Sequence, residues 1–305
     1  MISKYAYKKL TWIDLESPTK EEVLSLMQEY AIPELVGEEL ITPTLRSKVD
    51  VYGNLIYLIL HFPIHPKNRK KNGGAEQEID FVIGQNFIIT THYERIDPLH
   101  EFSKMFNVNS VLDRSMMGEH AGFLFYYIIR ELYKYSLTQL EEVNESLRDI
   151  EKNIFEGREG EMVETISNVN RTLLDFKQAI RFHAETLKSF ETAGGQFFGT
   201  QFSYYLGAMT GEYNKIQNML DGHKEILNDL RNTNDSLLSS KTNDTMKKLT
   251  IMNFIILPLA LLTGVFGMNM NFVFIKTTTD FTVVVGAMLL IAVLMFLYFK
   301  EKRWF

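Results

Sequence analysis

The sequence predicts an α+β domain that leads into long helices and ends in two transmembrane helices. Three observations predict this architecture. Residues 249–268 and 282–299 contain no charged side chain, and each run is about long enough to cross roughly 30 Å of hydrocarbon as a helix. Residues 116–246 follow helical spacing, whereas residues 1–115 mix strand and helix patterns. We therefore expect an α/β cytoplasmic domain at 1–115, a helical hairpin and coiled-coil stalk at 116–246, and a two-helix transmembrane domain at 247–305.

Composition excludes several classes of protein. The chain has 305 residues, a net charge of -6 and no cysteine. The acidic balance argues against a nucleic-acid partner. The lack of cysteine excludes disulfides, thiolate nucleophiles and cysteine-ligated zinc. Residues 141–164 carry nine acids and three bases, which predicts a solvated helix face, and an anionic surface that concentrates cations is the alternative.

The charges that flank the two uncharged runs predict the topology. Lys247 and Lys248 precede the first run, and Lys300, Lys302 and Arg303 follow the second. Basic residues favour the cytoplasmic side of a membrane, and the N-terminus has no apolar signal core. We therefore expect a multi-pass protein of the cell (inner) membrane, in contact with lipid, with both termini in the cytoplasm.

The N-terminal domain begins with clear local signals. Residues 11–15 alternate like a short strand. Thr19 and Glu22 have the spacing of a capping box, so a helix should begin there. The runs 49–62 and 79–92 are rich in β-branched and aromatic residues and predict strands.

The basic stretch at residues 63–74 separates these two runs and predicts a solvated hairpin loop, with contact to acidic lipid headgroups as the alternative.

Three histidines in this domain raise the question of a metal site. His61 and His65 flank Pro63, which prevents a regular helical pair, and His92 brings no third ligand at a recognisable spacing. We therefore interpret them as structural or surface residues. The sequence has no phosphate-binding glycine motif, nucleophile elbow or metalloprotease helix, so we expect neither an enzyme nor a cofactor.

The middle of the chain predicts a long antiparallel helical hairpin. Residues 123–154 form the first helix, Gly157 and Gly160 mark the turn, and residues 163–190 form a second helix that ends at the glycine pair 194–195.

A coiled-coil seam follows the hairpin. Its residues alternate steps of three and four, and they are Leu206, Met209, Tyr213, Ile216, Leu220, His223, Leu227, Leu230, Asn234 and Leu237. The polar His223 and Asn234 suggest positions that fix register. Residues 201–268 would span about 100 Å as one helix, and a helix of that length needs partners from the hairpin, from neighbouring subunits or from both.

The membrane end carries a family resemblance. Residues 243–250 (Asn-Asp-Thr-Met-Lys-Lys-Leu-Thr), 257–259 (Leu-Pro-Leu) and 264–270 (Gly-Val-Phe-Gly-Met-Asn-Met) resemble the CorA family of divalent-cation transporters. The triplet Gly267-Met268-Asn269 matches that family's signature at the end of the first membrane helix. The resemblance implies a homopentameric funnel in which the first span lines a central pore and the second faces lipid. It further implies passive flux of hydrated magnesium, and often of cobalt or nickel.

The triplet also has a physical rationale as an ion site. Magnesium gives up its hydration shell reluctantly, so neutral oxygens that hydrogen-bond to its waters suit a selective pore. Helix-end carbonyls carry partial negative charge, and Asn269 adds an amide oxygen. A plain helix-ending turn is the alternative.

One face of the first span is the expected pore lining. Its members are Asn243, Met246, Leu249, Asn253, Leu257 and Gly264. By resemblance, Met246, Leu249 and Leu257 would form an apolar constriction above a polar ring of Asn243.

Two features depart from the family pattern. Asn253 stands where a small apolar residue is expected, so it either adds a hydration ring to the pore or hydrogen-bonds between helices. The loop 270–279 has no acid and contains Lys276, which opposes cation access unless it contacts headgroups or pairs with Asp280. The acids of the family's regulatory ion site do not align clearly, so magnesium as a regulator has no assigned residues.

Three functions follow from these patterns. The first is a passive divalent-cation channel, with magnesium as the main ion. The second is a ZntB-like zinc transporter driven by a proton gradient. The third is a membrane-anchored coiled-coil sensor that conducts nothing.

Overall fold

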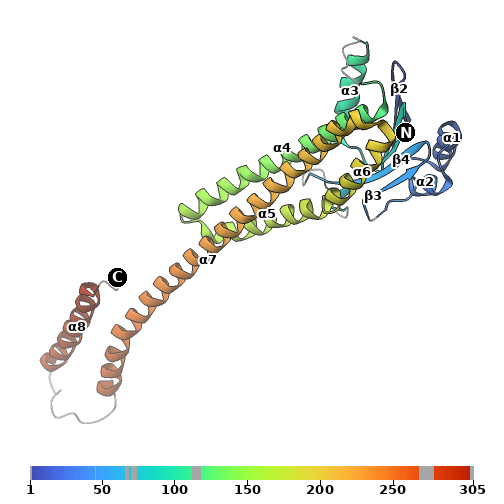
Figure 1. Cartoon of the computed structure of the whole chain (residues 1–305). Coiled ribbons are helices and arrows are strands. Elements are labelled where there is room, and N and C mark those ends of the chain that lie inside the picture. Colours follow the sequence, from blue (N-terminus) through green and yellow to red (C-terminus); the bar gives the residue numbers. More distant parts are fainter. Residues whose placement is uncertain are drawn as a thin grey trace. The chain divides into compact units, whose positions relative to one another are not determined.

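The computed structural model describes residues 2–44, 46–65, 69, 74–111, 118–267 and 278–302 (Figure 1). The chain divides into two compact units, Met1–Arg231 and Asn232–Phe305. The first unit holds a sheet and most of the helices, and the second holds the end of one long helix and the last helix. Each unit is described separately below.

The sheet of the first unit has six strands in the order β1-β2-β6-β5-β4-β3. Their bounds are β1 (Ile2–Tyr7), β2 (Leu10–Glu16), β3 (Lys48–Tyr52), β4 (Leu55–Pro63), β5 (Glu76–Ile83) and β6 (Phe87–His92). Neighbouring strands are antiparallel except β2 and β6, which run parallel with Thr11 opposite Phe87. The strand predictions are confirmed, although each of the two long runs contains two strands separated by a tight turn.

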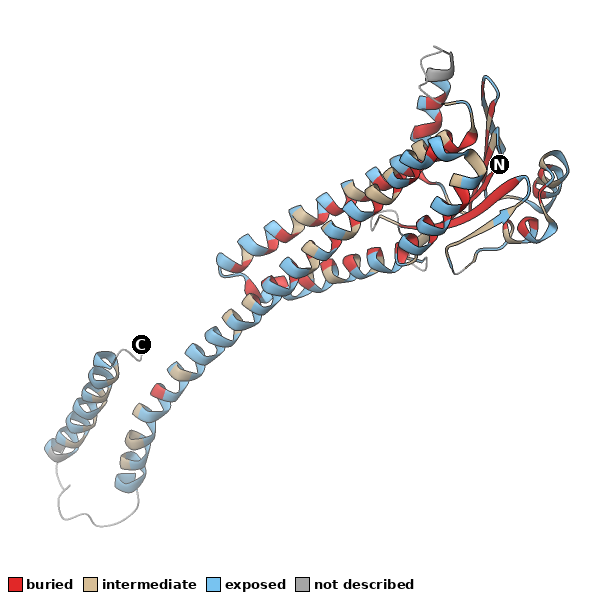
Figure 2. Cartoon of the chain, viewed as in Figure 1, coloured by how far each residue is buried: buried red, intermediate tan, exposed pale blue. Residues whose placement is uncertain are grey.

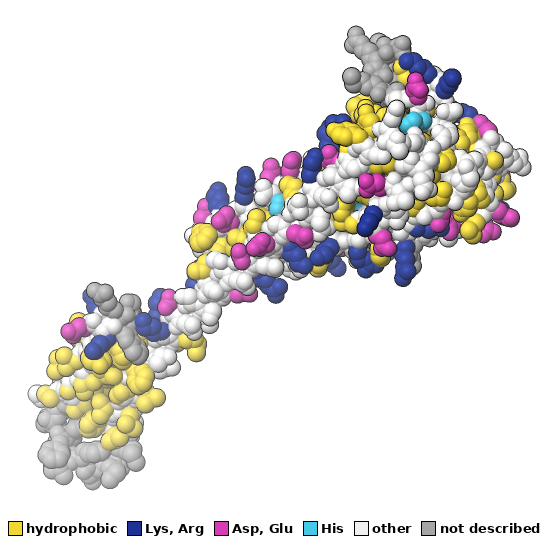
Figure 3. All heavy atoms as spheres, in the orientation of Figure 1, with side chains coloured by type: hydrophobic (Ala, Val, Ile, Leu, Met, Phe, Trp, Pro, Cys, Tyr) yellow, Lys and Arg dark blue, Asp and Glu magenta, His cyan; other side chains and the backbone are white. Residues whose placement is uncertain are grey.

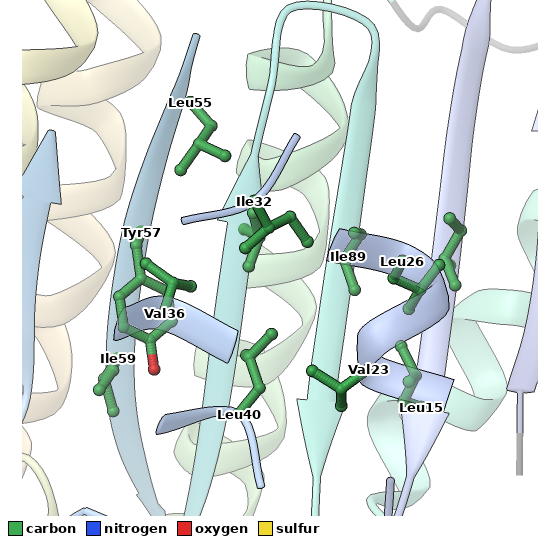
Figure 4. Close-up of a cluster of buried hydrophobic side chains, with 12 residues drawn as sticks. Leu15, Val23, Leu26, Ile32, Val36, Leu40, Leu55, Tyr57, Ile59 and Ile89 are labelled. Atoms are coloured by element: carbon green, nitrogen blue, oxygen red, sulfur yellow. The ribbon is translucent and has the colours of Figure 1, made fainter. Parts of the chain in front are cut away.

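Helices α1 (Lys20–Tyr30) and α2 (Glu34–Glu39) cover one face of the sheet. Figure 4 shows Val23, Leu26 and Val36 of this layer in front of the strands that carry Tyr57 and Ile89. The capping box is confirmed, because the Glu22 amide donates to the Thr19 hydroxyl and the Thr19 amide donates to the Glu22 carboxylate at 2.9 Å. These buried apolar side chains form one core of the unit.

The opposite face of the sheet packs against larger helices. They are α3 (Asp97–Val111), α4 (Ala121–Phe155), α5 (Glu159–Ala179) and α6 (His183–Phe198). Phe81 of β5 meets Phe125 of α4 with ring centroids 5.2 Å apart, and Trp12 of β2 meets Phe102 of α3 at 5.5 Å. Strand β4 is buried along its whole length because it has helices on both faces.

The expected single helix at 163–190 is wrong. The chain breaks between α5 and α6 and then continues helical through the glycine pair 194–195 to Phe198. The break is set by long-range contacts at its end, where His183 is fully buried and hydrogen-bonds to β4 and α4. The glycine pair therefore does not end a helix. At Gly194 a larger residue would be crowded, because an added Cβ would lie 3.0 Å from the Leu206 side chain.

The turn between α4 and α5 also differs from the prediction in one respect. Gly157 has a φ of 86°, a left-handed conformation that favours glycine. Gly160 already lies in the first turn of α5, with nothing within 4 Å of an added Cβ. Only Gly157 of the two glycines therefore makes the turn.

The long helix α7 (Ser203–Gly267) follows a short 3₁₀ turn, η2 (Thr200–Phe202). The predicted seam is buried from Leu206 to Leu230 (Figure 2). It packs within the subunit, because the Tyr213 ring lies 6.5 Å from that of Tyr133 on α4 and Leu206 contacts Gly194 of α6. The hairpin is thus a confirmed partner of α7, and its buried seam is used inside one subunit.

In the second unit, the end of α7 lies beside α8 (Thr278–Glu301). The rings of Phe254 and Phe299 are 6.3 Å apart. Both helices are long and apolar enough to cross a membrane, and hydrophobic side chains cover most of their described surface (Figure 3). They match the two predicted spans.

Candidate ion pathway

One face of α7 in the second unit packs against α8. Ile251 is fully buried, and Ile255, Pro258, Leu259 and Leu262 are half-buried, whereas most of their neighbours are exposed. Their spacing places all five on one side of a helix. With about 100° of rotation per residue, they span an arc of roughly 100° centred about 30° from Ile251.

The predicted pore-lining residues lie on the other side of α7. All six are exposed in the single chain: Asn243, Met246, Leu249, Asn253, Leu257 and Gly264. By the same rotation they lie between about 160° and 280° from Ile251. The structure therefore brings them together on a face that α8 does not cover.

This face combines apolar side chains with neutral polar groups. Met246, Leu249 and Leu257 are 58%, 49% and 69% exposed. Between them lie Asn253 and Thr250, whose hydroxyl donates to the Met246 carbonyl at 2.8 Å. A chain surface of this kind is costly in lipid where the amide meets hydrocarbon. It suits either a water-filled axis or contact with other helices.

The signature triplet is only partly described. Gly267 is the last residue of α7 and is exposed. It lies at about 160°, at the edge of the predicted lining, and it also borders a cavity between α7 and α8. Met268, Asn269 and Lys276 lie outside the described residues, as does the side chain of Asp280. Their predicted roles therefore stay predictions.

A cavity of about 540 Å³ lies between α7 and α8 and is bordered by Leu259, Thr263 and Gly267 of α7. Apolar residues form most of its described wall, including Phe281 and Met288 of α8. Among the described residues of this wall, the side-chain hydroxyl is that of Thr263, which donates to the Ala260 carbonyl at 2.8 Å. The described wall therefore lacks a side-chain amide like that of the exposed face.

The histidines of the sheet domain have structural partners. In His61, Nδ1 lies 3.1 Å from the Ser47 hydroxyl and Nε2 lies 3.0 Å from the Thr44 carbonyl. Burial alone would lower the pKa of His61, but the Glu78 carboxylate and the Thr44 carbonyl outweigh it and raise that pKa.

His92 and His65 are also engaged. His92 Nδ1 lies 2.6 Å from the Glu94 carbonyl, and His65 Nε2 lies 3.0 Å from Glu142. Among the described residues, no group of three or more His, Asp or Glu side chains could hold a metal ion. The interpretation of these histidines as structural is consistent with every one of these contacts.

Each of the two charged stretches has two interpretations. In the basic loop, Arg69 donates to Asp175 of α5 at 2.7 Å, so this residue contacts protein. The acids of 141–164 are exposed on α4, on α5 and in the turn between them, except for Glu159, which is buried. Both a solvated helix face and an anionic surface that concentrates cations require this exposure, so the two stay predictions.

The α8-facing stripe of α7 was not predicted from the sequence. Its signal was available in the spacing of Ile251, Ile255, Pro258, Leu259 and Leu262, which is complementary to the spacing of the pore-lining set. A run that is apolar on all sides hides such a stripe, because hydrophobicity alone does not separate a helix-facing side from a lipid-facing side.

The family model described as CorA-like Mg2+ transporter protein matches residues 7–303. The chain belongs to this family. The resemblance inferred from the membrane end is confirmed, and the chain is a member of a family of divalent-cation transporters, which are channels or transporters and not enzymes.

Two relatives extend over almost the whole of this CorA family member. The cobalt/magnesium transport protein CorA of Thermotoga maritima is 24% identical over 296 residues, which cover 96% of this chain and 83% of the relative. The protein of the same name from Methanocaldococcus jannaschii is 22% identical over 312 residues, covering 97% and 92%.

Solved structures confirm the fold. The complete CorA magnesium transporter from Methanocaldococcus jannaschii has a TM-score of 0.82 at 19% identity and covers 99% of this chain and 94% of its own. The full-length CmaX protein has a TM-score of 0.71 at 13% identity, covering 97% and 89%. The ZntB cytoplasmic domain from Vibrio parahaemolyticus has a TM-score of 0.61 at 12% identity, covering 76% and 89%. An α+β domain followed by long helices and two terminal spans is therefore the fold of this chain.

Proposed function

We propose that this CorA family member is a homopentameric channel that passes hydrated Mg²⁺ passively through the cell (inner) membrane, with both termini in the cytoplasm. The observation that carries the proposal is the exposed face of α7 opposite α8. If five copies turn this face toward a common axis, each α8 lies on the outside toward lipid. The apolar and amide groups then line a path, and no span exposes the Asn253 amide to hydrocarbon.

Each part of this path has a proposed role. Gly267, Met268 and Asn269 form a ring of carbonyl and amide oxygens that accepts hydrogen bonds from the waters of the ion. Met246, Leu249 and Leu257 form an apolar constriction that blocks conduction when it is dry. Asn243 forms a polar ring at the cytoplasmic end. Mg²⁺ is cargo in this scheme and a regulator of gating, and no resident cofactor is involved.

The test is Mg²⁺ uptake into liposomes that contain the purified full-length chain. Asn269→Ala should reduce the flux by at least about a hundredfold, because one hydrogen bond per subunit is lost from the ring. The pentamer should survive, and Met288→Leu in the wall of the α7–α8 cavity should leave the flux unchanged. Equal flux in wild type and Asn269→Ala would contradict the proposed ring.

A zinc transporter driven by protons is the second candidate, favoured by the fold shared with the ZntB cytoplasmic domain. The same liposomes, loaded with a Zn²⁺ indicator and given a pH gradient, distinguish the two. Zn²⁺ flux that requires the gradient would replace the Mg²⁺ proposal. Absence of flux for Mg²⁺, Co²⁺, Ni²⁺ and Zn²⁺ would instead support the non-conducting sensor.

A further inference from the structure

We infer that Asn253 forms a second polar ring in the membrane part of the ion path, between the ring at Gly267–Asn269 and the Asn243 ring at the cytoplasmic end. The inference rests on the proposed pore. The sequence leaves two roles open for this amide, a lining of the path and a hydrogen bond between helices, and we assign it the first.

The rotational position of Asn253 favours the path. The α8-facing stripe is centred about 30° from Ile251, so the direction opposite α8 lies at about 210°. Asn253 lies at about 200°, within roughly 10° of that direction. Its side chain is exposed in the single chain, and it makes no hydrogen bond to other described residues.

The flanks of α7 are where contacts between neighbouring copies are expected. Met252 and Leu261 lie at about 100° and 280°, close to a quarter turn from the direction opposite α8. Both are apolar and exposed, at 54% and 66%. Neighbouring copies can therefore pack through these apolar flanks without using Asn253. An amide at the centre of the face then points toward the axis of the assembly.

The residues before and after Asn253 on this face indicate what the ring would do. Leu249 and Leu257 are one turn away on either side, about 6 Å along the helix. Gly267 is about 21 Å away. Along this interval the other polar side chain on the face is that of Thr250, whose hydroxyl already donates to the Met246 carbonyl. A hydrated ion that leaves the outer ring would otherwise meet mainly apolar side chains. A carboxamide can accept from the waters of the ion and donate to other waters, and being neutral it does not hold a divalent cation tightly.

The ring is therefore a site for a hydrated divalent cation at which the hydration shell is kept. It lowers the barrier between the outer ring and the cytoplasm, since conduction requires several sites that bind weakly. It also wets the interval between Leu249 and Leu257, and so makes the apolar constriction easier to open.

The experiment compares Mg²⁺ flux, native mass and thermal stability of the full-length chain for Asn253→Leu, Asn253→Ser and wild type. Asn253→Leu should lower the flux at least about tenfold, since an apolar ring cannot hydrogen-bond to the shell of the ion. Asn253→Ser should restore it to within about threefold of wild type, since a hydroxyl can accept from a bound water. Mass and melting temperature should stay the same.

Thr263→Val is the matched control. It also removes a polar group from the same span, but the Thr263 hydroxyl already donates to the Ala260 carbonyl and lines the α7–α8 cavity. Its flux should equal that of wild type. A comparable loss of flux in Thr263→Val would overturn the inference, because any polar group in the span would then have the same effect.

Three other outcomes would also overturn it. Unchanged flux in Asn253→Leu, with flux still sensitive to Asn269→Ala, would remove the second ring and leave the proposed function standing. Loss of the pentamer in Asn253→Leu would assign the amide to contacts between copies. A wild-type chain that passes no Mg²⁺ would overturn the proposed function and this ring with it.

Discussion

His183 is a fully buried histidine that joins three elements of the first unit. Its Nε2 donates to the His61 carbonyl of β4 at 2.8 Å, and the Tyr133 hydroxyl of α4 donates to its Nδ1 at 2.9 Å. The carbonyl requires a proton on Nε2, and in the neutral ring Nδ1 accepts from Tyr133. Burial lowers the pKa of His183 to about 3.

This pKa predicts a loss of stability in acid. The unfolded chain binds a proton at His183 below about pH 6.5, whereas the folded chain does not until about pH 3. The free energy of unfolding should therefore fall by about 1.4 kcal/mol for each pH unit below about 6.5. His183→Gln keeps a donor for His61 and an acceptor for Tyr133, and it removes this dependence.

Urea unfolding of the full-length chain in detergent at pH 7 and pH 5 measures the effect. Wild type should lose about 2 kcal/mol more than His183→Gln over this interval. His61, His92 and the carboxylates titrate in both proteins, so the difference isolates His183. Parallel losses in the two proteins would show that the folded chain binds the proton.

At the scale of the helix, Gly157 and Gly160 should respond oppositely to the same substitution. Gly157→Ala places a Cβ at a φ of 86° and should cost about 1–2 kcal/mol. Gly160→Ala adds a Cβ to an α-helix with free space around it and should stabilise by about 0.5–1 kcal/mol. Chemical denaturation of both variants measures this, and a shift of the same sign in both would contradict the assignment of the turn.

These elements show what sequence can predict. The capping box at Thr19, the turn at Gly157 and the seam from Leu206 were predictable because each depends on residues a few positions apart. The break before His183 was not, since residues 180–182 contain neither glycine nor proline and the helix ends there because of partners on β4 and α4.

The candidate site divides in the same way. The exposed face of α7 was predicted because helical periodicity and the family resemblance select the same residues. The stripe that packs on α8 was not, because both sides of the span are apolar. The distinction comes from the partner helix, and a single sequence does not specify which side the partner occupies.

At the scale of the whole molecule, the first unit should fold without the membrane spans. Its sheet is covered on both faces, and the seam of α7 is buried through Leu230. A fragment of residues 1–231 should be soluble and should melt cooperatively. A fragment of residues 1–200, the matched control, exposes the apolar sides of α4 and α6 and should melt at least about 5 °C lower or aggregate.

Circular dichroism melts of the two fragments provide the measurement. Equal melting temperatures would contradict the role of α7 as part of this core. Failure of the longer fragment to fold would show that the first unit depends on the spans or on other subunits.

The parallel pairing of β2 with β6 constrains the order of events during synthesis. β2 is made early, but its neighbour in the sheet is complete only when His92 has been added, and the first span begins much later, at Leu249. All six strands are therefore synthesised well before the first segment that requires a bilayer. A nascent chain of this kind can pair all six strands before its first span is made, so formation of the sheet does not depend on membrane insertion.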